Sequence, residues 1–561
     1  MRPIGCGFYQ GFRSRDRHDS SRADSSLVER AEEVLRHRRS PLLNRREFLT
    51  GLAAASIAGV KKGKAEENAS PVFSSLIPSK PCKAPNYWCT WSAQNYVYGQ
   101  GMGSVDIGLL EGDSGSRLAH DAMGEAVLLG PNGWASSFHS RVREDLYLLL
   151  DDGWEKGGTA TFELDSAKFP SFKGSSAKRL EALNRELRRI GWRGAALWCR
   201  NPPDGDSGAA LESMCVEARI EYWKIDGGDR DFSLVKYRDD RRLPLTLEHV
   251  NGEPPTNGDW KQDGRFGSQP WDSRRMEILR HTDVYRTYDV TSILSLPTTL
   301  DRLSEMLKSA AGHPELRGLI NVEDEAYVAA VMGCTMGVMR HPLHGLRGAS
   351  DPDLFFNGSR HTKMRMDEIV RALHWQRIAP PFASGVGTFQ CSQEILKDGW
   401  TFSAGETWSH TLLGATVWQS APAVLARDVE IPIVESEGEK PFVFACRFPG
   451  GAVAIGAQER THPRRDWYMP AARVTLNAAD APGPFGIFGE FERLTLRFGS
   501  MRPGLRVIAQ DLAGDEPVDI TGDVDFDGTS IQFNGRMLRR IGLSSRTPGD
   551  LSSPGLVVAI T

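Results

Sequence analysis

The sequence predicts an α/β protein in which a (β/α)8 TIM barrel is followed by a C-terminal antiparallel β-sandwich. Two observations favour this architecture. Over more than half of the chain, short apolar runs alternate with amphipathic patterns of spacing three and four. In the last third, short segments separated by Gly, Pro and Asp replace the helical patterns. A chain of 561 residues is also too long for one ordinary domain, so two or three domains are expected.

The composition is that of a folded protein with a packed core. Apolar residues make up 40% of the chain and charged residues 25%, and the formal net charge is -4. A general nucleic-acid-binding protein would usually carry a basic excess, so that class is disfavoured. The 8 Cys are not those of a disulfide-dense scaffold, although one or two bridges, for example around Cys199 and Cys215, are compatible with the spacing. No motif for a zinc site occurs.

Residues 1–70 are expected to be an export leader. Arg45 and Arg46 precede a short, weakly apolar stretch at 51–60, and lysines follow it. This arrangement resembles a twin-arginine signal, which the twin-arginine export machinery recognises. The apolar stretch is about half the ~20 residues that a membrane span needs. We therefore expect a periplasmic or extracellular protein without a membrane span, with a basic amphipathic helix as the alternative for the leader.

Residues 82–382 are predicted to form the barrel. The stretch 176–190 carries leucines on one helical stripe, and Gly191 follows where a helix end favours glycine. Helix-then-strand units of this kind recur. The expected strands are residues 87–91, 146–150, 195–199, 222–225, 245–247, 284–287, 319–322 and 337–339. Eight strands suit a barrel, and we prefer it to a doubly wound sheet because acidic residues recur at the strand ends, where barrel enzymes carry their chemistry.

Residues 385–561 are predicted to form the β-sandwich, after a helix at 362–378. The expected strands there include 442–448, 452–455, 473–476, 494–498 and 505–509. The acidic stretch 523–528 resembles part of a calcium loop, but a hairpin turn at Asp527-Gly528 is the better interpretation.

Carboxylates follow four of the eight expected strands. They are Asp151 and Asp152 after the second strand, Asp226 after the fourth, Glu248 after the fifth and Asp289 after the sixth. Cleavage of a glycosidic acetal needs one carboxylate to attack or stabilise the anomeric carbon. It also needs one carboxylic acid to protonate the leaving oxygen. The pattern therefore favours a glycoside-cleaving site at this rim of the barrel.

Several motifs in this region occur in a recognisable order. They are Trp88-Cys-Thr-Trp91, Asp151-Asp152-Gly-Trp154, Asp165 with Phe169-Pro170, Lys224-Ile-Asp226-Gly, Glu248, and Arg286 with Asp289. Over residues 85–290 the chain resembles the α-galactosidase (melibiase) family, glycoside hydrolase family 27, or a sister family of the same clan.

The resemblance implies a retaining exo-glycosidase that acts on α-galactoside-type linkages of an oligosaccharide or polysaccharide. It makes Asp226 the nucleophile and Asp289 the general acid and then base. The sugar would be held by Asp151, Asp152, Lys224, Arg286 and Glu248, with Trp91 and Trp154 as an aromatic platform. No metal or organic cofactor is implied.

The chain departs from the family pattern at three places. Asp289 follows Arg286 one residue sooner than the pattern has it. The segment after the seventh strand carries Glu323, Asp324 and Glu325, any of which could supply the acid instead. The loop 248–254 also differs, which leaves α-N-acetylgalactosaminides or β-L-arabinopyranosides open as substrates. A carbohydrate-binding protein without catalysis is the third hypothesis.

Most of these residues also have a structural interpretation. Asp226 could pair with Lys224, Glu248 could form an interior salt bridge, and the two platform tryptophans could belong to the core. His249, Arg340 and His341 lie near strand ends and could bind an acidic substituent, but structural roles are favoured.

Overall fold

The computed structural model describes residues 73–91, 93–94, 120–158, 160–229, 231–250, 273–286, 294–344, 365–401, 416–463, 466–479, 483–500 and 504–561. The expected leader and Asp289 lie outside these residues. Within them, no helix is long and apolar enough to cross a membrane.

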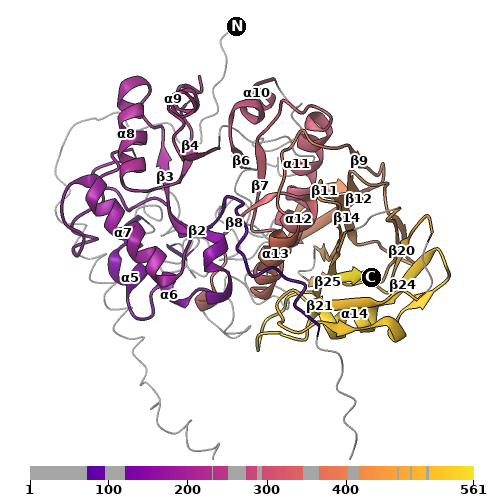
Figure 1. The fold of residues 1–561 in the computed structure, drawn as a ribbon. Coiled ribbons are helices and arrows are strands. Elements are labelled where there is room, and N and C mark those ends of the chain that lie inside the picture. The colour runs from indigo at the N-terminus through magenta and orange to yellow at the C-terminus, as the bar shows by residue number, and fades with distance from the viewer. Residues whose placement is uncertain are drawn as a thin grey trace, which may run out of the picture. The chain divides into compact units, whose positions relative to one another are not determined.

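The eight expected strands form a closed barrel in chain order (Figure 1). They are β1 (Asn86–Cys89), β2 (Leu146–Leu150), β3 (Gly194–Arg200), β4 (Tyr222–Asp226), β5 (Thr246–His249), β6 (Val284–Arg286), β7 (Leu319–Glu323) and β8 (Thr335–Val338). Each strand pairs in parallel with the next, and β8 pairs in parallel with β1. The predicted barrel is therefore confirmed, with strand bounds within a few residues of those expected.

Helices connect the strands. They are α5 (Glu125–Leu129), α6 (Trp134–Ser137), α7 (Ser176–Ile190), α8 (Gly205–Glu217), α9 (Ser233–Arg241), α10 (Ser273–His281), α11 (Ser295–Ala310), α12 (Ala326–Met332) and α13 (Asp367–Ile378). Helix α7 has the predicted bounds. Gly191 ends it in a left-handed conformation with φ 106°, and its N–H donates to the last carbonyls of the helix.

The strands separate two kinds of side chain by alternation. Leu148, Trp223 and Ile225 point outward into the large apolar core that the helices cover. Tyr147 and Tyr222 point into the barrel, where aromatic and small side chains form a second cluster. The inward positions nearer the carboxyl ends of the strands carry the charged groups described below.

The C-terminal region is rich in strands, but its sheets are mixed. One sheet has the order β22-β21-β25-β19-β15-β14-β12-β9, and another has the order β13-β18-β20-β24-β23. The pairs β12 with β14, β15 with β19, and β18 with β20 are parallel. The expectation of a purely antiparallel domain was therefore wrong, because the connections between these strands cross to the far side of a neighbour instead of turning back as hairpins.

The strands of this region agree with most of the expected segments. They are β9 (Phe389–Cys391), β10 (Ile395–Thr401), β11 (Thr416–Pro422), β12 (Val424–Arg427), β13 (Ile433–Glu435), β14 (Phe442–Arg447), β15 (Val453–Gln458), β16 (Arg460–His462), β17 (Asp466–Tyr468), β18 (Arg473–Asn477), β19 (Phe485–Gly489), β20 (Arg493–Arg497), β21 (Val507–Asp511), β22 (Val518–Asp519), β23 (Asp525–Phe526), β24 (Ser530–Asn534) and β25 (Gly555–Ile560), with α14 (Gly535–Gly542). The turn at Asp527 joins β23 to β24 as predicted, and the Asp527 carboxylate accepts the backbone N–H groups of Thr529 and Ser530.

Helices α12 and α13 join the barrel to the C-terminal sheets. Trp375 of α13 is fully buried and packs edge-to-face against Phe448 and Phe488, with ring centroids 5.9 and 6.0 Å away. Arg371 of the same helix is also buried and donates to Asp511 of β21 at 2.9 Å. The barrel and the sheets therefore share one packed core.

The cysteines of the described residues are all free. Cys199 and Cys215 lie buried in the outer core and form no disulfide. The bridge considered for this pair is therefore not present, and burial raises the pKa of both thiols.

The shared core makes a stability prediction. Trp375→Ala removes a buried indole and should lower the free energy of unfolding by about 3–5 kcal/mol. Urea unfolding followed by circular dichroism measures this change, and one transition should shift as a whole. Ile395→Ala, on an exposed side chain, is the control and should change little. A loss confined to one of two separate transitions would contradict the shared core.

Candidate active site

The carboxyl ends of the barrel strands bring together most of the acidic residues singled out from the sequence. In a closed parallel barrel these ends meet at one rim, and inward side chains there face a common space. Asp151 follows β2, Asp226 ends β4 and Glu323 ends β7. By alternation all three lie on the inner side of the barrel wall.

Asp151 forms a buried ion pair across the inside of the barrel. The Lys224 ammonium lies 2.9 Å from Asp151 Oδ2, and both side chains are less than a tenth exposed. The Cys89 thiol contacts the same oxygen at 3.1 Å, and the Asp152 N–H donates to Oδ1 at 2.9 Å. Burial acts to raise the pKa of the Asp151 carboxyl, but the ammonium and these donors outweigh it and hold the pKa below its usual value. Asp151 is therefore a fixed carboxylate.

A second buried pair joins β6 to β7. Arg286 Nε and Nη2 lie 2.7 and 2.6 Å from Glu323 Oε2. Burial acts to lower the pKa of Arg286, but Glu323 and the nearby acidic groups raise it well above its usual value. The guanidinium is therefore permanently charged, and it holds the carboxylate of Glu323 in the barrel wall.

Glu248 lies inside the barrel. It is fully buried and accepts hydrogen bonds from Tyr87 at 3.1 Å, from Asn321 at 3.0 Å and from Tyr222. Burial raises the pKa of its carboxyl. Because every contact comes from the barrel itself, the structure places Glu248 as an interior polar anchor.

Asp226 differs from all these acids. Its side chain is partly exposed, and within the described residues no hydrogen bond or ion pair reaches its carboxylate. Its position depends on the backbone instead. The Val250 N–H donates to Ile225 O at 3.0 Å and the Asn201 N–H donates to Asp226 O at 3.4 Å. The expected pairing partner, Lys224, is taken by Asp151, which leaves Asp226 as an unpaired carboxylate at the rim.

Asp152 is the other partly open carboxylate. It is 25% exposed, and His120 Nδ1 lies 3.1 Å from its Oδ1. The Gln94 amide donates to Asp152 O at 2.7 Å. Trp91, at the end of the first strand segment, is also partly exposed and packs against the inner cluster. These residues form a polar and aromatic edge beside the ends of β1 and β2.

Trp154 lies outside this group. Its indole is fully buried, packs edge-to-face on Phe162 and donates to Trp198 O at 3.2 Å. Its ring belongs to the outer core, which is the structural alternative for this residue.

The three acids after the seventh strand have different surroundings. Only Glu323 points into the barrel. Asp324 adopts a left-handed φ of 57° and accepts the Met339 and Arg340 N–H groups. Glu325 begins α12, is buried and accepts a hydrogen bond from Ser295. Asp324 and Glu325 therefore hold the wall together, and Glu323 is the one that faces the barrel interior.

The basic residues near the strand ends have structural partners. His249 bonds Asp229 and Thr282, and His341 bonds Trp134 O at 2.9 Å. Arg340 is buried against Asp324 and Glu368.

Two rim residues were missed from the sequence. Arg200 ends β3, and its register partner on β4 is Asp226, so both lie on the inner side of adjacent strands. His120 contacts Asp152 from a segment far from it in the sequence. Had the expected strand 195–199 been extended by one residue, Arg200 would have been placed at the rim. No local sequence pattern points to His120.

Other acidic groups lie away from the rim. Among the described residues, Asp204, Asp229 and Asp231 come close enough to share a cation. However, His249 and the start of α9 already occupy both oxygens of Asp229.

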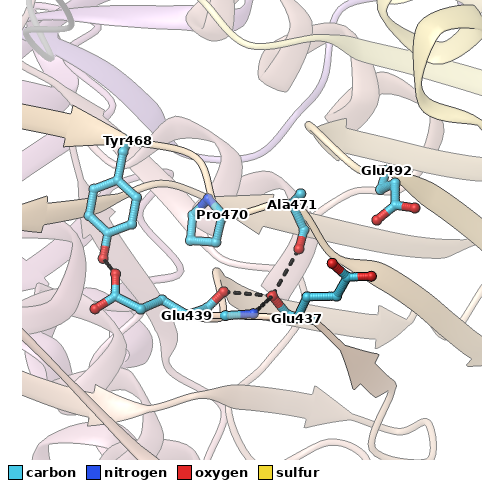
Figure 2. A pocket seen from close by; sticks show the side chains of 8 residues that line it. Glu437, Glu439, Tyr468, Pro470, Ala471 and Glu492 are labelled. Carbon is cyan, nitrogen blue, oxygen red and sulfur yellow. Dashed lines mark hydrogen bonds between the residues drawn. The ribbon is translucent and has the colours of Figure 1, made fainter.

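An open hollow of about 300 Å³ lies in the C-terminal region and is lined by Glu437, Glu439, Tyr468 and Glu492 (Figure 2). Tyr468 donates to Glu439, and Arg473 pairs with Glu492 at 2.7 Å. Two of the three acids in this hollow, Glu439 and Glu492, are therefore already paired.

No match was found among family models, curated proteins or solved structures. The geometry of the rim is therefore the basis for assigning a function.

The Asp151–Lys224 pair makes a prediction about stability. Lys224→Met leaves a carboxylate buried without its cation and should cost about 3–5 kcal/mol in urea unfolding. The double variant Asp151→Asn/Lys224→Met should recover part of this loss, because no unpaired charge remains. Equal losses in the single and double variants would show that the ion pair is not what makes Lys224 important.

Glu325 makes a prediction about pH. Burial raises the pKa of its carboxyl to about 7, against about 4.3 in an unfolded chain. The native state therefore binds a proton more tightly, so this stability is present below about pH 4 and is lost as the pH rises through about 7. Between pH 5 and pH 8, Glu325→Gln should lose less stability in urea than the wild type. The exposed Glu435→Gln variant should follow the wild type, and parallel curves for all three proteins would refute the assignment.

Proposed function

We propose that the chain is a retaining glycoside hydrolase that removes terminal α-galactoside-type sugars, with Asp226 as the nucleophile. One observation carries the proposal. At the rim of a closed barrel, beside the buried Asp151–Lys224 ion pair, the Asp226 carboxylate is partly exposed and has no partner within the described residues. A nucleophile needs a free oxygen aimed at the substrate, whereas a structural acid would be paired.

The proposed reaction has two steps. The Asp226 carboxylate attacks the anomeric carbon as the glycosidic C–O bond breaks, and the leaving oxygen takes a proton from a carboxylic acid. Water then loses a proton to that same residue and attacks the anomeric carbon, which frees Asp226. The sugar leaves with its original anomeric configuration.

Asp289 is the proposed acid and base, on the strength of the family resemblance. Glu323 is the alternative that the geometry leaves, since it alone of its cluster faces the barrel interior. Two nitrogens of Arg286 already contact Glu323 Oε2, which suits a residue that holds the site better than one that exchanges a proton with the substrate. Retention would require the two catalytic carboxyls to lie about 5–5.5 Å apart.

The remaining rim residues fit a sugar-binding role. Asp152 offers a hydrogen-bond acceptor for the hydroxyl groups of a sugar. The partly exposed Trp91 offers an apolar surface for the C–H face of the sugar ring. Asp151 and Lys224 would hold sugar hydroxyls as well, through the lone pairs and N–H groups that their ion pair does not use. Export by a twin-arginine signal is proposed with this function, from the leader sequence alone.

The test is hydrolysis of three aryl glycosides: the α-galactoside, the α-N-acetylgalactosaminide and the β-L-arabinopyranoside. We expect turnover of the galactoside with retained configuration, as seen by proton NMR of the first product. Asp226→Ala should lose at least about 1,000-fold in kcat, since the covalent route is removed. Asp206→Ala, an exposed acid at the start of α8, is the control and should keep its activity.

Azide assigns the two roles. With an activated substrate, azide should rescue Asp226→Ala and give the inverted β-glycosyl azide, because it attacks the sugar directly. It should rescue the acid/base variant with retained α-configuration, because it replaces water at the covalent intermediate. Rescue of Glu323→Ala instead of Asp289→Ala would move the acid/base role to Glu323. Sugar binding without turnover of any panel member would overturn the enzymatic proposal in favour of a binding protein.

A further inference from the structure

A buried carboxylate–imidazole pair joins the loop that follows the proposed nucleophile to the neighbouring strand. His249 Nε2 is 2.8 Å from Asp229 Oδ2, and both side chains are wholly excluded from solvent. Asp229 follows Asp226 by three residues, and His249 ends the neighbouring strand β5. Glu248 faces the barrel interior, so by alternation the next residue, His249, lies on the outer side of β5.

The loop that begins at Asp226 has an unusual backbone. Gly227, Gly228 and Asp229 all adopt positive φ, at 76°, 80° and 43°. A residue with a side chain rarely adopts such a conformation unless its surroundings hold it there. For Asp229 the holding contacts are its carboxylate bonds. Oδ1 accepts the Leu234 N–H at 3.0 Å, which fixes the start of α9, and Oδ2 faces His249.

His249 extends this connection to the strand beyond. Its Nδ1 lies 2.8 Å from the Thr282 hydroxyl, which also lies 3.0 Å from Leu247 O and 2.8 Å from Val284 O. The carboxylate of Asp229 accepts only, so Nε2 donates to it. The Thr282 hydroxyl carries one proton, which it can donate to Nδ1 or to one of the two carbonyls. The pair thus ties the loop after β4 to β5 and to the segment that leads into β6.

On its other side, the loop packs against Asn201 and Pro202, the residues that follow β3. A Cβ on Gly227 would lie 2.7 Å from the Asn201 side-chain oxygen, and a Cβ on Gly228 would lie 3.0 Å from Asn201 Cα and from Pro202. The loop therefore packs closely against the residues that follow β3, and a side chain at either glycine would force them apart. On the opposite side, the loop is held by Asp229 and His249.

We propose that Asp229 and His249 are positioning residues that hold the Asp226 carboxylate in its attacking position. The carboxylate itself has no partner in the described part of the chain, so its location depends on this backbone. A buried pair of polar side chains is weak evidence for a role in stability, because apolar side chains of the same volume often serve as well. What such a pair adds is a fixed position for the loop backbone that carries Asp226. The inference rests on the proposed role of Asp226.

Two matched substitutions separate the contacts of His249. His249→Gln places an amide nitrogen close to the position of Nε2 and keeps a donor for Asp229. His249→Asn places one close to Nδ1 and keeps the Thr282 contact, but leaves Asp229 Oδ2 without its partner. We expect His249→Asn to lower kcat roughly 10- to 100-fold with KM within about twofold, the effect of misplacing a reacting group by about 1 Å. His249→Gln should retain most of the activity.

Amide hydrogen exchange gives a readout that does not depend on turnover. The amides of Phe232 and Leu234 bond the Asp229 carbonyl and carboxylate, so they should exchange faster in His249→Asn than in His249→Gln or the wild type. His374→Asn is the control. It alters a buried histidine of α13 that contacts Leu512 O, and it should change stability without changing kcat or this exchange.

The outcomes are distinguishable. Unchanged exchange in His249→Asn would overturn the positioning role whatever the activity. Faster exchange with unchanged kcat would show that the pair holds the loop but not the nucleophile, which also overturns it. If the wild type turns over no glycoside, the proposed function fails, and exchange alone then decides whether the pair holds the loop.

Discussion

The charged pairs inside the barrel are the constraint on which the site depends. Asp151 with Lys224, and Arg286 with Glu323, are nearly excluded from solvent. Taking such groups out of water costs several kcal/mol for each ion, and only close, well-oriented partners offset that cost. Strand register and barrel closure must therefore place opposite charges within hydrogen-bond distance. Glu248 has no such ion pair, and its buried carboxylate instead accepts hydrogen bonds from Tyr87, Tyr222 and Asn321. The interior is specified by polar contacts as much as by apolar packing.

This arrangement also explains why Asp226 stays open. Lys224 and Asp226 are two residues apart on β4 and lie on the same face, so the ammonium is the nearest obvious partner. Asp151 already accepts it at 2.9 Å, together with the Cys89 thiol. Arg200 is beside Asp226 in the β3–β4 register, yet it forms no ion pair with it. The open carboxylate of Asp226 thus follows from the pairing of Lys224 with Asp151.

Much of the barrel could be predicted because its signals are local. Buried parallel strands give short apolar runs, and leucines at spacings of three and four mark helix α7. The same runs do not say where each side chain points at a strand end. Glu323, Asp324 and Glu325 are adjacent, but the left-handed φ at Asp324 turns the chain, so only the first faces inward. Trp154 was assigned to the site from its motif, whereas Gly153 at φ 103° turns it into the outer core. The His120–Asp152 contact is long-range and leaves no local signal.

The C-terminal sheets limit sequence-based prediction for a different reason. Antiparallel and parallel neighbours present the same alternation, so residues 453–458 could not be assigned to one kind of pairing. The structure pairs β15 antiparallel with β14 and parallel with β19. The arrangement of these strands depends on how they pack against helix α13. Gly486 of β19 lies directly against the Trp375 indole, where a Cβ would come within 3.0 Å of the ring. The close approach of α13 thus requires that glycine at that register. The barrel's last helix and the sheet behind it therefore specify each other, which no segment of sequence shows when it is considered alone.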